Sequence, residues 1–439
     1  MKRIALTGIG AGIGFAVGMV LLPFAYGAVD SDWASGHAAL DRFGDAFRTV
    51  RDRYVEQPDD TKMVEGAISG MMSNLDPHSS YFDPRTFTDM TVRTEGQYGG
   101  VGLVISTESG VVKVVNPIDD TPGSRAGIKP GDTISAIDGQ EVMGKNLDQV
   151  QQKLRGPAGT KLKLTIVRSG VKDPFDINLV RAAISVEGVK FHREGDVGYI
   201  RIPAFNELTT EGVQKAVRDL KAQIGPGIKG YIIDLRDDGG GVLDAAIGVS
   251  DTFLDGGEVV STRGRHPSDN SRYDAKAGDM ADGKPIVILT NSGTASASEI
   301  VAGALQDHKR AITMGTTSFG KGSVQTIIPL DNGDEGALHM TTARYFTPSG
   351  RSIQATGIVP DIAVASSKGD ENDSILYAET ESILPHHLAP DDSKPPTVMA
   401  APIKPPPGKT YDDFQLTYAV DYLDGKTKES AVASRTGGN

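Results

Sequence analysis

The stretch from Pro285 to Gln325 constrains the fold more than any other part of this 439-residue chain. It opens with an apolar, β-branched run at 286–289, which predicts a buried strand. A turn at 291–293 follows. Apolar residues at helical spacing then predict a helix, namely Ile300, Val301, Ala304 and Leu305. The pattern is therefore strand, turn, helix, with Ser296 and Ser298 at the start of the helix.

A lysine between two glycines follows that helix, in the run Phe319-Gly320-Lys321-Gly322. A free lysine has a pKa near 10.4, so it is protonated at neutral pH. Burial lowers such a pKa by up to about 3 to 5 units, which brings it near working pH. The flanking glycines let the backbone pass close to a nucleophile. A serine at a helix start and a lysine in a tight loop are the parts of a Ser-Lys nucleophile.

Composition excludes several classes of protein. The net charge of −12 argues against a nucleic-acid binder, because such binding needs clustered Lys and Arg. The absence of cysteine excludes a disulfide scaffold, a thiol nucleophile and Cys-ligated zinc. The eight histidines show no metal-ligand spacing. We expect neither a metal nor a cofactor.

The N-terminus predicts export. Met1-Lys2-Arg3 is a short basic segment, and residues 4–22 form an uncharged apolar run. Ala25 and Gly27 are small residues at positions suited to cleavage after Gly27. The run is also long enough to remain as a membrane anchor. We therefore expect residues 1–27 to be a signal peptide or an anchor, and the protein to lie in the periplasm or cell envelope, with inner-membrane anchoring as the second form.

Changes of pattern divide the rest of the chain into four parts. Residues 28–95 are mostly helical, residues 96–183 are compact, β-rich and glycine-punctuated, and residues 184–370 alternate strands and helices. Residues 371–439 are a Pro-rich tail with one amphipathic helix at 411–423. The expected fold class is a multidomain α+β and α/β protein.

The β-rich part resembles a PDZ domain of the kind found in bacterial processing proteases. Gly-Ile-Lys-Pro-Gly-Asp132 and Ile-Asp-Gly139 carry that resemblance. A glycine-rich loop frees backbone N–H groups for a terminal carboxylate, and the strand beside it accepts an extended peptide. Four consecutive residues are expected to form that loop and bind the substrate tail: Gly100, Val101, Gly102 and Leu103.

Four motifs together resemble the carboxyl-terminal processing (tail-specific) protease family over residues 36–365. They are 75–82 (Leu-Asp-Pro-His-Ser-Ser-Tyr-Phe), 234–241 (Asp-Leu-Arg-Asp-Asp-Gly-Gly-Gly), 294–299 (Thr-Ala-Ser-Ala-Ser-Glu) and 318–325 (Ser-Phe-Gly-Lys-Gly-Ser-Val-Gln). The resemblance implies a helical lobe, a PDZ domain and a mixed-sheet protease core with the ClpP/crotonase fold. Thr294 and Asp238 depart from the family's usual serine and asparagine, and both glycines of the second motif are retained.

The resemblance also implies roles for individual residues. The nucleophile falls on Ser296, the general base on Lys321 and the supporting glutamine on Gln325. The oxyanion region falls on Gly240 and Gly241, and the Ala297 N–H at the helix start is the expected second donor. Three further residues match positions that the family uses near its site: Glu299, Asp307 and Ser318.

Other site assignments remain as alternatives. Ser298 is a second candidate nucleophile, although it lies deeper in the helix. A triad using Asp307 and His308 would lie about 16 Å from Ser296 along the helix. Residues 315–322 nearly spell a P-loop, but Gly322 replaces the hydroxyl that binds Mg²⁺ and a strand follows. His78 could be a ligand or a base, but a lone histidine in a loop more often has a structural role.

We expect an exported serine endopeptidase that captures free C-terminal tails through its PDZ domain and cleaves near the C-terminus. Its expected partners are protein substrates, an adaptor protein and further copies of itself, with membrane association through the N-terminal segment and no nucleic acid. We also expect the ligand-free enzyme to be partly misaligned, with Arg168 close to the linker into the core. The alternatives are a PDZ-bearing scaffold with an inactive protease core and a crotonase-like acyl-CoA enzyme.

Overall fold

The computed structural model describes residues 33–108, 111–118, 120–145, 147–185, 188–366, 380–390 and 401–427. The chain divides into two compact units, residues 1–66 and 67–439. The predicted signal peptide or anchor at 1–27 lies outside the described residues. Among the helices that are described, none is long and apolar enough to cross a bilayer.

The N-terminal region is helical, as predicted, and contains α1 (Trp33–Arg53), α2 (Asp60–Ser73) and α3 (Pro84–Glu95). The start of α3 is fixed by Asp83, whose side chain accepts the Thr86 N–H at 2.7 Å. The helix ends at Gly96, whose φ of +68° suits a glycine. The short strand β1 (Ser80–Phe82) interrupts the helices and pairs with a strand of the protease core. Sequence analysis missed β1, because three residues are too few to show an alternating pattern.

The PDZ domain is an antiparallel β-structure with two short helices. Its main sheet has the order β3-β4-β5-β7-β8, with β6 on β5, so β3 lies at an edge and is available for strand addition. Its apolar centre includes Val112, Ile134, Leu164 and Ile166. The elements are β2 (Gln97–Gly100), β3 (Leu103–Glu108), β4 (Val111–Pro117), α4 (Pro122–Arg125), β5 (Thr133–Ile137), β6 (Gln140–Glu141), α5 (Leu147–Leu154), β7 (Lys161–Val167), β8 (Phe175–Val180) and β9 (Ala182–Ser185).

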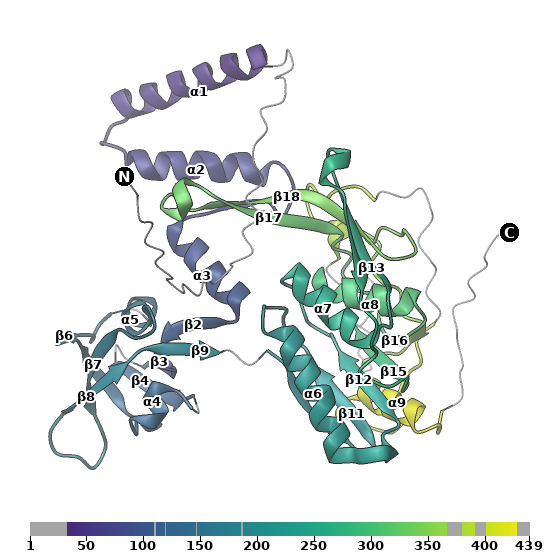
Figure 1. The fold of residues 1–439 in the computed structure, drawn as a ribbon. Helices are drawn as coiled ribbons and strands as arrows, with labels where there is room; N and C mark the ends of the chain where they lie inside the picture. Colours follow the sequence, from purple (N-terminus) through teal and green to yellow (C-terminus); the bar gives the residue numbers. More distant parts are fainter. Residues whose placement is uncertain are drawn as a thin grey trace, which may run out of the picture. The chain divides into compact units, whose positions relative to one another are not determined.

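A six-stranded, mainly parallel sheet forms the protease core, with α6, α7, α8 and α9 packed against it (Figure 1). Its order is β10-β11-β12-β15-β16-β19, and only the β10–β11 pair is antiparallel. The strands are β10 (Lys190–Glu194), β11 (Val197–Arg201), β12 (Gly230–Asp234), β15 (Ile286–Thr290), β16 (Ile312–Gly315) and β19 (Ile362–Ala363). Every residue of β12 and β15 is buried, which explains their continuous apolar runs.

The two faces of this sheet bury two different apolar clusters. Ile233 and Ile288 face a cluster with α6 (Thr209–Ile224), α7 (Leu243–Phe253) and α8 (Ala297–Asp307). Ile232 and Val287 face a cluster with α9 (Phe414–Leu423), which includes Phe414. The predicted tail helix is therefore part of the core.

A second, antiparallel sheet completes the protease core, in the order β1-β18-β13-β14 with β17 on β18. The strand predicted after Gly322 is β17 (Ser323–Pro329), which pairs with β18 (Ala337–Phe346). Sequence analysis missed the hairpin β13 (Gly257–Gly264) and β14 (Ser271–Ala275), whose polar, partly exposed residues resemble a loop. Short 3-10 helices occupy 225–227, 267–269, 331–333 and 381–383.

Candidate active site

Ser296 lies at a strained turn between β15 and α8. It is the residue that precedes the helix, its φ is +57°, and it is only partly buried. A positive φ is unfavourable for a residue with a Cβ, so the surroundings must hold it in place. Thr294 does so by donating its hydroxyl to the Leu235 carbonyl at 2.8 Å, and the Ala295 N–H donates to the Asp238 carbonyl at 2.9 Å. The predicted strand, turn and helix are thus present, and Ser296 lies in the turn directly before the helix.

Glu299 joins the Ser296 turn to the Lys321 loop. Its fully buried carboxylate accepts four hydrogen bonds, two on each oxygen. The Ser296 and Lys321 N–H groups donate to Oε2 at 2.8 and 2.9 Å. The Ser318 hydroxyl and the Gly320 N–H donate to Oε1 at 2.5 and 2.8 Å. Burial raises the pKa of Glu299 to about 7, against the opposing effect of these four donors.

The Lys321 loop packs as closely as its flanking glycines suggest. A Cβ on Gly322 would lie 2.7 Å from the Gln354 nitrogen. The hydroxyl of the buried Tyr345 hydrogen-bonds the Lys321 carbonyl and lies 3.1 Å from the Ser296 carbonyl. Burial lowers the pKa of the Lys321 amine, and neighbouring carboxylates oppose that shift. This is the direction that a lysine base requires.

Ser296 and Lys321 share these supports but are not themselves joined. Among the hydrogen bonds of the described residues, none links Ser296 Oγ to Lys321 Nζ. Nor does any hydrogen bond of the described residues join Gln325 to the Lys321 amine. The Gln325 Nε2 donates to Ser323 Oγ at 2.9 Å and to Thr341 Oγ1 at 3.0 Å.

The glycine loop at 238–241 lies against the Ser296 turn. A Cβ on Gly240 would lie 2.9 Å from the Ser296 Cβ, and Gly240 itself has a φ of +91°. The Gly240 N–H donates to Asp238 Oδ1 at 2.8 Å, whereas the Phe205 backbone bonds to both sides of Gly241. Neither the Gly241 nor the Ala297 N–H has an acceptor among the described residues. These two donors are therefore the available pair for an oxyanion.

Burial raises the pKa of Asp238 to about 7. Its Oδ2 is buried and has no hydrogen-bond partner within the described part of the chain. Asp238 is fully buried, and nothing in the pattern of residues 234–241 indicates that burial.

The alternative site residues have other contacts. Ser298 is fully buried and donates its hydroxyl to the Asp238 carbonyl at 3.1 Å. Asp307, at the far end of α8, accepts the Ser349 N–H at 3.1 Å, and His308 contacts the Glu258 carbonyl at 2.7 Å. Asp307 was expected near the site from the family resemblance, and the structure places it with Ser349 and Arg351 instead.

The predicted tail-binding loop lines a small groove in the PDZ domain. Val101, Gly102 and Leu103 lie in the wall of a cavity of about 100 Å³, opposite Leu154 and Arg155 at the end of α5. Gly100 lies at the end of β2, paired with β9. Arg168, which was expected close to the linker into the core, pairs with Asp132 inside the PDZ domain at 2.7 Å.

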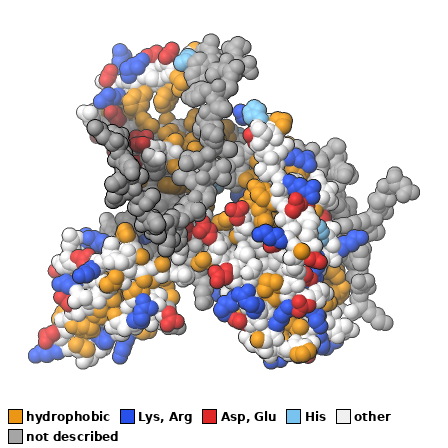
Figure 2. Space-filling view, viewed as in Figure 1, with side chains coloured by type: hydrophobic (Ala, Val, Ile, Leu, Met, Phe, Trp, Pro, Cys, Tyr) orange, Lys and Arg blue, Asp and Glu red, His pale blue; other side chains and the backbone are white. Residues whose placement is uncertain are grey.

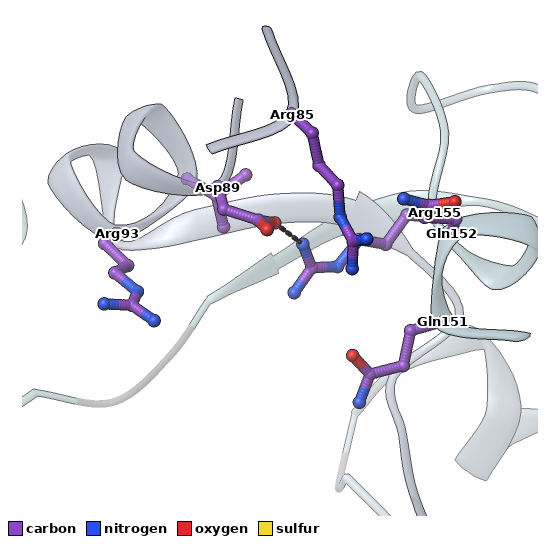
Figure 3. A pocket seen from close by; sticks show the side chains of 7 residues that line it. Arg85, Asp89, Arg93, Gln151, Gln152 and Arg155 are labelled. Carbon is purple, nitrogen blue, oxygen red and sulfur yellow. Dashed lines mark hydrogen bonds and ion pairs between the residues drawn. The ribbon is translucent and has the colours of Figure 1, made fainter. Parts of the chain in front are cut away.

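A second, polar cavity of about 250 Å³ lies between α3 and α5 (Figure 3). Arg85, Asp89 and Arg93 project into it from α3, and Gln151, Gln152 and Arg155 from the PDZ side. Arg155 bridges the two sides through its ion pair with Asp89 at 2.7 Å.

The surface charge is mixed. On the face drawn in Figure 2, basic and acidic side chains are interspersed and form no continuous basic stripe.

Sequence analysis did not identify the polar cluster beside Lys321. Glu381, fully buried, binds His78 and Gln354 at the back of the lysine loop. His78 had a visible signal in its motif at 75–82. Glu381 had no such sequence signal, because it lies in a stretch without apolar periodicity.

Within the described residues, no group of three or more metal-ligating side chains occurs.

Comparison with known proteins agrees with this arrangement. The model for Peptidase family S41 matches residues 196–364, that for the PDZ domain matches 113–168, and that for the activating protease CtpB N-terminal domain matches 27–86. A carboxy-terminal-processing protease of Bartonella bacilliformis is 49% identical over 393 residues, which cover 89% of this chain and 90% of the relative. The carboxy-terminal processing protease CtpA of Bacillus subtilis is 34% identical over 332 residues, covering 75% and 70%.

Among solved structures, a photosystem II D1 C-terminal processing protease is 29% identical, with a TM-score of 0.42 and coverage of 77% of this chain and 94% of that one. The level of identity to the curated relatives, over most of both chains, establishes the family. The chain belongs to the carboxy-terminal processing proteases of peptidase family S41, and it is a serine-type peptidase with a PDZ domain.

Proposed function

We propose that this chain is an exported endopeptidase that captures free C-terminal tails and cleaves them by means of Ser296 and Lys321. The observation that carries the proposal is the shared anchor of these two residues on Glu299. One carboxylate oxygen accepts the backbone N–H of both, which fixes the distance between their two turns. Only Ser296 of the two candidate serines is partly exposed, while Ser298 is buried.

The reaction proceeds by acyl transfer. Neutral Lys321 Nζ takes the proton from Ser296 Oγ as this oxygen attacks the peptide carbonyl. The carbonyl oxygen becomes negative and accepts the N–H groups of Gly241 and Ala297. Lys321 then gives its proton to the leaving amine, which releases the C-terminal fragment. Water then attacks the acyl-enzyme while Lys321 takes its proton, and Lys321 returns this proton to the departing Ser296 Oγ, which releases the acid product and restores the free serine.

Gln325 supports Lys321 from β17 in this proposal. Its side chain is held by Ser323 and Thr341, on the sheet that follows the lysine loop. An amide can approach the amine without adding the negative charge that raises a lysine pKa. Because no hydrogen bond of the described residues joins Ser296 Oγ to Lys321 Nζ, we further propose that the resting site is partly misaligned and closes when substrate binds.

The PDZ domain delivers the substrate. Its edge strand β3 and the groove beside Leu103 and Leu154 suit an extended apolar tail with a free carboxylate. Deleting residues 97–180 is expected to lower cleavage of even a short peptide, through loss of alignment. Unchanged activity in that deletion variant would contradict this gating role.

The decisive experiment compares an unfolded polypeptide that ends in a free apolar tail with the same polypeptide amidated at its C-terminus. We expect the free form to be cut, and the amidated form at least about tenfold more slowly, because the terminal charge is lost. Ser296→Ala and Lys321→Ala should abolish cleavage, and Ser298→Ala should keep it within about tenfold. Binding of the free tail without cleavage by the wild-type protein would instead favour the scaffold.

Export is a further part of the proposal and rests on residues 1–27, with their basic start and small residues before Ala28. N-terminal sequencing of protein from the envelope fraction is expected to begin at Ala28 if the segment is cleaved, or at Met1 if it is an anchor. Recovery of the protein in the cytosol alone would contradict export.

A further inference from the structure

The segment at 380–390 returns to the protease core beside the lysine loop. Its residue Glu381 begins a short 3-10 helix and is fully buried. The Glu381 N–H donates to the Phe319 carbonyl at 3.0 Å, two residues before Lys321. A residue that follows Lys321 by sixty positions in the sequence is thereby fixed against its loop.

The Glu381 side chain holds the other flank of the same loop. Its Oε1 accepts the Gln354 Nε2 at 2.9 Å, and the Gln354 Oε1 accepts the Gly322 N–H at 2.9 Å. Gln354 is fully buried, so this bridge is shielded from water. The lysine loop is therefore clamped before and after Lys321, in both cases through Glu381.

The second oxygen of Glu381 faces the segment at 75–82. Its Oε2 lies 2.7 Å from His78 Nε2, and the side chain of His78 is 16% exposed. Burial opposes the ionisation of Glu381, but the hydrogen bonds from His78 and Gln354 and the charges of His78 and Lys321 hold its pKa below the ordinary value. Glu381 is thus an ionised carboxylate beside the lysine.

The charged groups around Lys321 come from four parts of the chain. Burial lowers the lysine pKa, and three carboxylates oppose this, with Glu381 the foremost. The titratable groups that face the site are Glu299 on α8, Asp76 and His78 on the segment at 75–82, His339 and Tyr345 on β18, and Glu381. Burial and the Lys321 charge lower the pKa of His339, so it adds little positive charge.

We propose that Glu381 is a positioning residue for Lys321, which clamps the lysine loop through Gln354 and sets a negative charge behind that loop. The proposal rests on the proposed role of Lys321 as the base. It assigns a function in the protease reaction to the segment that follows the protease core.

The test separates charge from clamping with three substitutions. Glu381→Gln keeps the size and the oxygen that accepts Gln354 but removes the charge. Its acid limb of kcat/KM against pH should move down by about one pH unit, and turnover at pH 6 should rise by up to about tenfold. Glu381→Asp keeps the charge but shortens the side chain, and Glu381→Ala removes both functions.

The clamp of the Lys321 loop by Glu381 predicts how kcat on the alkaline plateau changes in these variants. The alkaline plateau of kcat should fall at least about tenfold in Glu381→Ala and less in Glu381→Asp, because a small displacement of the base is costly. KM should change little in all three, because Glu381 is not proposed to touch substrate. Glu211→Gln, an exposed carboxylate on α6, is the matched control and should leave the profile unchanged.

An acid limb that is identical in Glu381→Gln and wild type overturns the electrostatic role, and an unchanged plateau in Glu381→Ala overturns the clamp. If Glu381→Ala does not fold, Glu381→Gln still tests the charge and Glu381→Asp the clamp. Ser296→Ala is measured in the same series. Residual cleavage by that variant would overturn the proposed function, whereas a Ser296-dependent enzyme that ignores Glu381 would overturn this inference alone.

Discussion

Replacing Glu299 with glutamine tests whether one carboxylate organises the site. The two oxygens of Glu299 each receive two donors, and at alkaline pH the side chain is ionised. In Glu299→Gln one oxygen becomes an amide nitrogen, which donates and cannot accept. The favoured orientation keeps the oxygen toward the Ser296 and Lys321 N–H groups and directs the nitrogen at Ser318 and Gly320.

The magnitude follows from counting donors that lose their acceptor. The Ser318 hydroxyl can turn to accept from the new amide, but its own proton and the Gly320 N–H then both lose their acceptor. A buried donor without a partner costs about 1 to 3 kcal/mol. Glu299→Ala leaves all four donors without an acceptor, and the same arithmetic gives at least about 4 kcal/mol. The first variant should keep measurable activity, since the Ser296 and Lys321 turns stay joined, and the second should lose it.

Thermal unfolding at pH 8 and turnover of the free-tailed polypeptide measure both effects. One kcal/mol corresponds to about 2 to 4 °C for a domain of this size. Glu211→Gln is the exposed control and should leave both measurements unchanged. If Glu299→Ala unfolds at the wild-type temperature and cleaves at the wild-type rate, the reasoning about the shared anchor is refuted.

Three further outcomes follow from the core. Burial raises the pKa of Asp238 to about 7, above the unfolded value near 3.9, so its contribution to stability is present at pH 4 and lost as pH rises through 7. Asp238→Asn should therefore reduce the loss of stability between pH 4 and 8, to which Asp238 contributes at most about 4 kcal/mol; an unchanged pH dependence of the unfolding temperature would contradict this. Gly241→Ala places a Cβ 1.9 Å from the Phe205 carbonyl oxygen at a φ of +146° and should abolish turnover, whereas Gly239→Ala meets no atom within 4 Å and should not; equal activities would refute the packing argument. Phe414→Ala should cost about 3 to 5 kcal/mol in thermal unfolding because Phe414 is buried against the sheet, and a shift below 2 °C would show that α9 is dispensable.

The sequence predicts those parts of the fold whose pattern is local. The buried strand at 286–290, the helix at 297–307 and the Ser296 turn follow from apolar spacing and turn residues within a single stretch. The local pattern also indicated a Ser-Lys nucleophile, whereas the family resemblance supplied the choice of Ser296 as its serine and the relevance of the glycine loop. The resemblance also suggested Asp307, which the structure places at the opposite end of α8.

The parts that were missed depend on contacts between distant segments. β1 becomes a strand only because β18 pairs with it, and its own three residues carry no periodicity. Glu381 lies in a stretch without apolar pattern, and only its backbone bond to Phe319 and its contact with His78 give it a function in the site. The hydrogen bond from the Gly240 N–H to Asp238 Oδ1 likewise depends on how the loop at 238–241 folds, which the sequence of that motif does not indicate.

The placement of α9 over the sheet has a consequence for biosynthesis. Ser80 on β1 cannot pair with His339 on β18 until His339 has been synthesised, 259 residues later. At about 5 to 20 residues per second, roughly 13 to 50 seconds separate their emergence from the ribosome. Phe414 follows later still, and until then one face of β12 and β15 is uncovered. Until α9 emerges, the nascent chain therefore carries a sheet whose second apolar face has no cover from this helix.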